Sequence, residues 1–252
     1  MKRLCQCPKC PYSALEKSPF CGVHNRSGCK VISPLSGFEP KYEPHLWNRD
    51  KGIKHSHNCF AYAVNYIDRA KADACRSTIG CDVRFHVPGL DKGHRDFRQK
   101  QKRQRNYMTC SDVVGRTESS LGGKILGFDD PCPPMMSKIA IVVDDKNDLH
   151  YYRQDSNGWW SHKPGGTAVT NLDAAGVRIY CPERAARTYY SADGDGVDLD
   201  YRYFCCYMAI PRVGPTAKRI QLAGSERRHK TAKRSHKTLK RVTTVRHRRL
   251  SI

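Results

Sequence analysis

The sequence has 252 residues, a net charge of +21, and 38% hydrophobic and 9% aromatic residues. This length and composition allow one moderate domain with a buried core and some appendages. A membrane-spanning protein is excluded, because there is no run of 18 apolar residues. We expect no signal peptide, because polar residues follow Met1 directly.

The positive charge is uneven along the chain. Residues 212–252 hold 14 Lys/Arg and one acid, Glu226, and so carry +13 of the total +21. We therefore divide the chain into a Cys/His arm (1–30), a folded domain (31–211) and a disordered basic tail (212–252). The tail has few aromatic residues, which favours nonspecific electrostatic contact with nucleic acid or another anionic surface. A disordered solubilising tail and a localisation signal are the alternatives.

The chain contains 13 cysteines. Without a signal peptide, a reducing compartment is the default expectation. We therefore interpret the cysteines as metal ligands, a nucleophile or packing residues rather than as disulfides. A particle that leaves the cell would still be open to later oxidation.

The arm carries the clearest candidate for a metal site. Its spacing is C-x-C-x2-C-x10-C-x2-H-x4-C, and structural zinc requires four such ligands in a tetrahedron. The arm has too few apolar residues to fold without a staple. We predict a structural zinc ion bound by Cys21, His24 and Cys29, with Cys10 or Cys7 as the fourth ligand. The alternatives are a disordered arm and an arm closed by disulfides.

A cysteine lies where the next apolar segment begins. The apolar spacing at 60, 61, 63, 64 and 67 predicts a helix that starts at Cys59, with Asn58 as its N-cap. A helix N-terminus lowers the pKa of a thiol and favours the reactive thiolate. His55 and His57 are near enough in sequence to reach Cys59. The alternative is a buried structural cysteine.

The second half of the folded domain is predicted to be mainly β. Cys110 opens a second helix with Ser111 as its cap, and strands follow over 138–145 and 149–155, with a turn at 146–148. A further turn at 156–158 leads into the segment that contains His162. The last strand covers 201–210, where alternation sends Cys205 and Cys206 to opposite faces.

These pieces resemble the papain-like cysteine hydrolases, in particular the bacterial cell-wall endopeptidase branch. The resemblance rests on NCFAYA at 58–63, followed by antiparallel strands that bear histidines. The block LHYYRQDSNGWWSHKPGGT at 149–167 is similar to poorly characterised bacterial and large DNA virus proteins, and SGFEP at 36–40 is similar to the viral ones. The resemblance as a whole extends from about residue 31 to 210, without a match between about 70 and 130.

The resemblance implies an α+β fold with a papain-like core, in which the helix that bears the nucleophile packs on an antiparallel sheet. It also implies an acyl-transfer or hydrolysis site with Cys59 as nucleophile and His150 as base. His162 would orient His150, with Asp155 as the competitor for that role. Asn58 or the Cys59 backbone N–H would stabilise the oxyanion.

Two classes of function follow. The first is a cysteine peptidase or amidase of a large DNA virus, packaged in the virion after assembly in the host cytoplasm. The second is an inactive structural or minor capsid protein of the same fold. In the second class the zinc arm and basic tail would bind capsid proteins, other virion proteins or nucleic acid.

Overall fold

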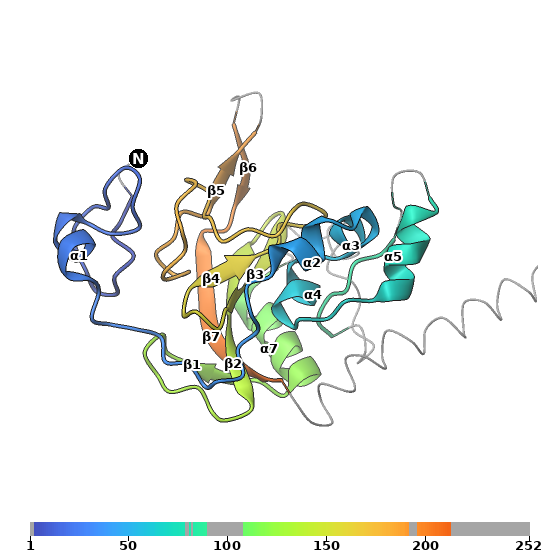
Figure 1. Cartoon of the computed structure of the whole chain (residues 1–252), viewed down its shortest axis with the longest axis horizontal. Helices are drawn as coiled ribbons and strands as arrows, with labels where there is room; N and C mark the ends of the chain where they lie inside the picture. The colour runs from blue at the N-terminus through green and yellow to red at the C-terminus, as the bar shows by residue number, and fades with distance from the viewer. Residues whose placement is uncertain (1–2, 79–80, 82, 90–107, 192–195, 213–252) are drawn as a thin grey trace, which may run out of the picture.

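The computed structural model describes residues 3–78, 81, 83–89, 108–191 and 196–212 (Figure 1). These residues form helices and antiparallel sheet, which confirms the predicted α+β class. The helices are α1 (Gly22–Ser27), α2 (Pro44–Asn48), α3 (Lys51–Ser56), α4 (Cys59–Ala63), α5 (Arg69–Arg76) and α7 (Cys110–Leu121). The strands are β1 (Lys124–Leu126), β2 (Met136–Asp144), β3 (Asp148–Gln154), β4 (Trp160–His162), β5 (Thr188–Tyr190), β6 (Val197–Asp200) and β7 (Tyr203–Pro211).

The main sheet has five strands in the order β1-β7-β2-β3-β4, and all neighbouring strands are antiparallel. The predicted strands at 138–145 and 149–155 are β2 and β3, and they pair with Val142 opposite His150. The last strand, β7, lies between β1 and β2. Strands β5 and β6 form a separate two-stranded sheet that projects from the body (Figure 1).

Strand β2 is buried on both faces because its apolar residues are continuous from 139 to 143. On one face, Ile139, Ile141 and Val143 pack with side chains of α4 and α7, such as Phe60 and Leu121. This face of the sheet therefore carries the helix that begins at the predicted nucleophile.

The opposite face packs against the segment between β4 and β5. Ala140 and Val142 contact a cluster that contains Trp160, Ile179 and Tyr207. Because side chains alternate along a strand, each residue of β3 belongs to one of these two faces only.

A β-bulge in β7 changes the predicted orientation of two cysteines. The pairing with β2 shifts between Cys206, opposite Ile141, and Phe204, opposite Val142, so Cys205 is the extra residue. Cys205 and Cys206 consequently both pack on the helix-bearing face, which corrects the expectation of opposite faces. From this position Cys205 forms a disulfide with Cys110 at the start of α7.

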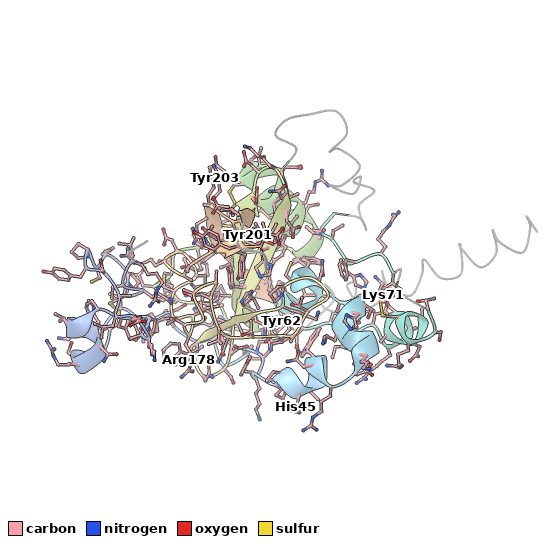
Figure 2. All side chains as sticks on the ribbon, turned by 90° about the horizontal axis from the view of Figure 1, so that it is seen from above. His45, Tyr62, Lys71, Arg178, Tyr201 and Tyr203 are labelled. Atoms are coloured by element: carbon pink, nitrogen blue, oxygen red, sulfur yellow. A yellow bond between two sulfur atoms is a disulfide. The ribbon has the colours of Figure 1, made fainter. Side chains whose placement is uncertain are left out.

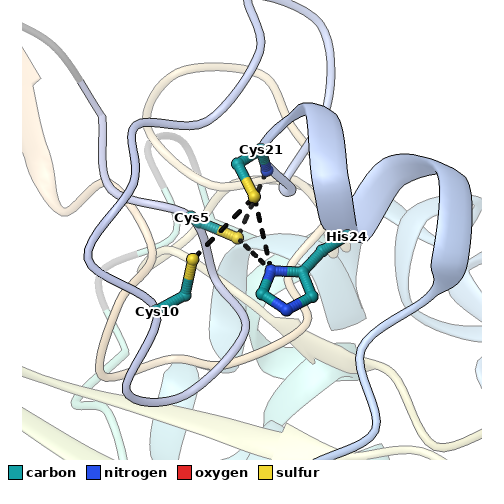
Figure 3. A group of neighbouring side chains, drawn as sticks. All are labelled: Cys5, Cys10, Cys21 and His24. Carbon is teal, nitrogen blue, oxygen red and sulfur yellow. Dashed lines mark hydrogen bonds between the residues drawn. The ribbon is translucent and has the colours of Figure 1, made fainter.

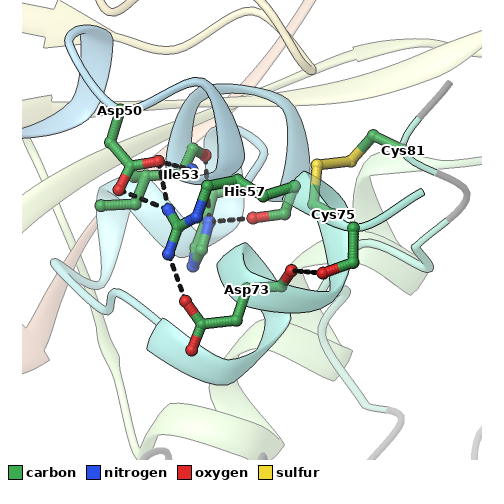
Figure 4. A network of polar contacts seen from close by, with 9 residues as sticks. Asp50, Ile53, His57, Asp73, Cys75 and Cys81 are labelled. Carbon is green, nitrogen blue, oxygen red and sulfur yellow. Dashed lines mark hydrogen bonds and ion pairs between the residues drawn. A yellow bond between two sulfur atoms is a disulfide. The ribbon is translucent and has the colours of Figure 1, made fainter. Parts of the chain in front are cut away.

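Six of the thirteen cysteines form disulfides, contrary to the expectation that none would. Besides the bond between Cys110 and Cys205, Cys75 is bonded to Cys81 at the end of α5 (Figure 4). The third disulfide joins Cys7 to Cys29 in the arm. Sequence spacing cannot reveal these pairs, because the partners meet only in the fold.

Two predicted helix starts are confirmed, with differences in detail. Asn58 caps α4 by accepting the backbone N–H of Ala61 at 3.1 Å, as predicted. Helix α4 ends at Ala63, however, and the chain turns at Asn65, where φ is 54°. Helix α7 begins at Cys110 as predicted, but Thr109 is the cap rather than the predicted serine.

The arm lies at one end of the molecule, and α5 lies at the other (Figures 1 and 2). Strand β7 ends at Pro211, where the folded domain was predicted to end, while 213–252 lie outside the described residues. No helix in the described part of the chain is long and apolar enough to cross a membrane.

Candidate metal centre and predicted thiol site

Four side chains of the arm form a cluster that could hold a metal ion: Cys5, Cys10, Cys21 and His24 (Figure 3). Their candidate ligand atoms all lie within 4.8 Å of one another. The local fold explains the cluster. Cys21 is the N-cap of α1, and its backbone carbonyl accepts the N–H of Asn25, so the first turn of α1 brings His24 beside Cys21.

Three of the distances between donor atoms are close to those that a tetrahedral metal site requires. The Nδ1 atom of His24 is 3.4 Å from Cys5 Sγ and 3.3 Å from Cys21 Sγ, while Cys10 Sγ is 3.8 Å from Cys21 Sγ. Zinc bonds of about 2.3 Å to sulfur and about 2.0 Å to nitrogen place neighbouring donors about 3.5–3.8 Å apart. The three thiols are buried, which shields the cluster from solvent.

The cluster contains one cysteine that readily becomes a thiolate. A hydrogen bond from the His24 backbone N–H lowers the pKa of Cys21 to about 6. Burial raises the pKa of Cys5 to about 11. A cation bound among these groups would favour the charged form of every thiol, because metal ligands must be deprotonated.

The predicted ligand set is partly corrected. Cys21, His24 and Cys10 belong to the cluster as expected, whereas Cys7 and Cys29 are joined in a disulfide. Cys5 takes the remaining position. The spacing could not identify it, because five cysteines in a short arm offer several sets of ligands.

The predicted nucleophile, Cys59, is buried with 4% of its surface exposed. It borders a small cavity of about 70 Å³ that is also lined by Asn58, Asp148 and Met108. Its Sγ donates to the Leu149 carbonyl at 3.8 Å, and among the described residues it has no hydrogen bond to a histidine. Burial, together with the negative charge of Asp148, raises the pKa of Cys59 to about 12.

The first turn of α4 therefore does not produce an activated thiolate. A five-residue helix has a small dipole, and complete burial of the thiol opposes its effect.

The predicted base, His150, faces away from Cys59. Leu149 and Tyr151 pack with Cys59 on the helix-bearing face, whereas His150 stacks against Tyr152 and Tyr201 on the other face. The alternation along β3 is the physical reason. The structure thus does not bring the predicted nucleophile and base together.

His150 and His162 do form a pair, as predicted from neighbouring strands. His162 Nε2 donates to the Leu172 carbonyl at 2.9 Å, so its Nδ1 accepts from His150 Nε2 at 2.7 Å. Burial lowers the pKa of His162 to about 4 and that of His150 well below its usual range. Both imidazoles are therefore neutral and buried.

The other proposed site residues have structural partners. Asp155 accepts from Arg153 Nε at 3.0 Å in a buried ion pair, away from His150. The Asn58 amide donates to the His86 carbonyl at 2.8 Å while its oxygen caps α4, so both ends of this side chain are engaged.

His55 is exposed, and His57 is held within the helical layer (Figure 4). His57 Nδ1 lies 3.1 Å from the Ile53 carbonyl, and its Nε2 accepts the Asp68 N–H at 2.8 Å. Neither ring is hydrogen-bonded to Cys59.

Sequence reasoning missed the role of Lys163. This lysine is fully buried, and its Nζ lies 2.6–2.9 Å from four backbone carbonyls. They belong to Lys54, His57, Gly165 and Thr167. Burial lowers the pKa of Lys163 to about 7. Through these hydrogen bonds Lys163 connects the end of β4 to the residues just before α4. The sequence around it, Lys-Pro-Gly-Gly, does not indicate this role.

Fold and site together define an α+β protein with a Cys₃His cluster that could hold a metal ion. No family model and no solved structure matches the chain. The chain is 32% identical over 152 residues to insoluble matrix shell protein 1 from Ruditapes philippinarum. The aligned region covers 60% of this chain and 84% of that protein. The chain belongs to the family of insoluble matrix shell protein 1.

Proposed function

We propose that the chain is a non-catalytic structural protein that assembles with other macromolecules into an insoluble matrix, and that a zinc ion holds its arm. The observation that carries this proposal is the environment of Cys59. The thiol is buried, its pKa is raised to about 12, and its predicted base lies on the other face of the sheet.

Zinc is the metal that best suits the cluster. Three thiolates and one imidazole are typical ligands of a structural zinc site, whereas calcium and magnesium prefer oxygen ligands. With four protein ligands the coordination is closed, and the ion would stabilise the arm rather than activate water.

The name of the relative supports the assembly role. That protein is called an insoluble matrix shell protein, and we propose that this chain likewise acts through association with other macromolecules. The strongly positive charge of +21 favours anionic partners. Packaging in a virion and binding of capsid proteins or nucleic acid stay predictions.

A cysteine hydrolase with a papain-like core is the second candidate. It is favoured by the position of Cys59 at the start of α4 beside a cavity. The two proposals differ in the reactivity that they require of this thiol.

The test is alkylation by iodoacetamide between pH 7 and 9, with the disulfides intact and each cysteine followed by mass spectrometry. We expect Cys59 at pH 8 to react roughly 10³-fold more slowly than free cysteine, because its thiolate is scarce. The His150→Gln variant should not change this rate. Cys206 is the internal control, because it is also a buried free thiol and its pKa is raised to about 11.

A Cys59 rate that titrates below pH 8 and loses this behaviour in His150→Gln would overturn the non-catalytic proposal. It would favour the hydrolase instead, and a screen of peptide and amide substrates would follow.

A further inference from the structure

The metal cluster is built into the contact between the arm and the body. The carbonyls of Cys5 and Cys10 accept hydrogen bonds from the body. Cys21 is preceded by Phe20, whose side chain packs against the body. The body side of this contact is residues 173–184, which we call the docking segment; it lies between β4 and β5.

The first contact is the Gln6 side chain, which is 1% exposed and follows Cys5 in the chain. Its Oε1 accepts the backbone N–H of Tyr180 at 2.6 Å and that of Cys181 at 3.2 Å. Its Nε2 donates to Asp173 Oδ2 at 3.1 Å. Gln6 thus satisfies buried polar groups that would otherwise lack these partners.

Asp173 organises the docking segment around Gln6. Its carboxylate accepts the backbone N–H groups of Ala175, Val177 and Ala186, each at 3.0 Å. The same segment is attached to the sheet by an isolated bridge between Ile179 and Trp160 of β4. A shift of Gln6 would therefore be transmitted to the edge of the main sheet.

The second contact is Arg184. Its Nε donates to the carbonyl of Cys5 at 2.6 Å, and its Nη2 donates to the carbonyl of Cys10. One guanidinium group therefore fixes the backbone of two residues of the cluster. Three thiolates and a divalent cation would carry a net charge of −1, which this guanidinium partly neutralises.

The third contact is aromatic. Phe20 precedes Cys21, and its ring centroid lies 4.9 Å from that of Tyr180 and 6.4 Å from that of Trp159. The other two tryptophans, Trp47 and Trp160, are fully buried in the body. Trp159 is therefore a natural reporter of the position of the arm.

We infer that metal binding in the arm and ordering of the docking segment are energetically coupled through Gln6 and Arg184. These two are positioning residues: they do not touch the metal, but they hold the backbone that presents its ligands. Coupling is reciprocal, so the docked body raises the affinity of the arm for the metal, and the metal strengthens docking. The inference rests on the proposed zinc site and adds its regulation by the body.

The experiment is a zinc titration of the full chain after removal of metal by a chelator, with the disulfides intact. Zinc affinity is measured by competition with a chromophoric chelator, and docking by tryptophan emission. We expect the wild type to bind one zinc ion with a parallel change in emission, and the Trp159→Phe variant to bind zinc with little change in emission.

Arg184→Gln and Gln6→Leu should each weaken zinc binding by about 10- to 100-fold, the usual effect of removing a group that orients metal ligands. They should also uncouple the emission change from zinc binding. Arg184→Lys keeps the positive charge but loses the planar guanidinium that donates to two carbonyls at once, so we expect an intermediate zinc affinity. Arg116→Gln is the matched control, because Arg116 is a buried arginine that pairs with Asp112 within α7, outside the docking segment.

The outcomes separate the two proposals. If the wild type binds no zinc, the proposed zinc site is wrong. If it binds zinc, but Arg184→Gln and Gln6→Leu match the wild type in affinity and emission, the zinc site stands and the coupling is overturned. Equal weakening by Arg116→Gln would also overturn it, because the effect would then be general loosening of the body.

Discussion

At the scale of single residues, burial determines the protonation of the side chains that were predicted to react. Cys59 is kept as a thiol, and His57, His150 and His162 are kept neutral. In each case loss of solvation is the largest cause, since transfer of a charge into the protein interior costs more than the neighbouring dipoles return. The same residue types would behave differently in an open cleft.

The histidine pair gives a prediction for acid stability. The pKa of His162 is about 4 in the fold against 6.5 when unfolded, so only the unfolded chain gains this proton between these values. The contribution of His162 to the free energy of unfolding is fully present above pH 6.5. It decreases by roughly 3 kcal/mol as the pH drops towards 4.

We expect His162→Gln to be less stable at pH 7, and to lose less stability than the wild type between pH 6.5 and 4. The expected difference in slope is about 1.4 kcal/mol per pH unit, measured by urea unfolding. His45→Gln is the control, because His45 is exposed. Parallel slopes for wild type and His162→Gln would contradict a neutral buried His162.

At the scale of elements, short helices are fixed by contacts that come from distant strands. Helix α4 has five residues, too few to be stable alone, and its position depends on packing against β3 and on Lys163. The lysine ties the residues after β4 to the carbonyl of His57, just before α4 begins.

The Lys163→Met variant should reveal the strength of this tie. Methionine fills a similar volume but leaves four backbone carbonyls without their donor, so we expect a loss of about 2–4 kcal/mol in the free energy of unfolding. The control is Lys54→Met, which removes a partly exposed ammonium and keeps the Lys54 carbonyl. If Lys163→Met were as stable as the control, the hydrogen bonds of Lys163 would not stabilise the fold, and the proposed role would be wrong.

At the scale of the whole molecule, the large hydrophobic clusters of the described residues lie in the body, and the arm is held by other means. The arm has four buried cysteines as its hydrophobic cluster, with few other apolar side chains around them. One disulfide and the contacts with the body hold the arm in place, and the proposed zinc ion would add a further link.

Removal of zinc should therefore loosen the arm and leave the body folded. We expect one zinc ion per chain by elemental analysis, and rapid tryptic cleavage at Lys9 and Lys17 after chelation, while β2 and β7 stay protected. Cys21→Ser should lose the zinc ion. Cys132→Ser should keep it, because Cys132 is a buried free thiol outside the cluster and outside the docking segment. If the arm is cleaved slowly even after chelation, a bound metal ion is not what keeps the arm ordered.

The sequence by itself determined the features that depend on local patterns. The cap at Asn58, the start of α7 at Cys110, the β2–β3 hairpin and the last strand follow from cap chemistry, turn residues and apolar runs. The arm was likewise identifiable as a metal candidate from the spacing of its cysteines and histidine.

Only the tertiary structure decided which of these side chains meet. The alternation along β3 separates His150 from Cys59, and one bulge places Cys205 where it can reach Cys110. The path of its loops divides the cysteines of the arm between a disulfide and a cluster that could hold a metal ion. A sequence pattern fixes spacing along one chain, whereas a site requires distances across the fold, and these are set by sheet register and packing.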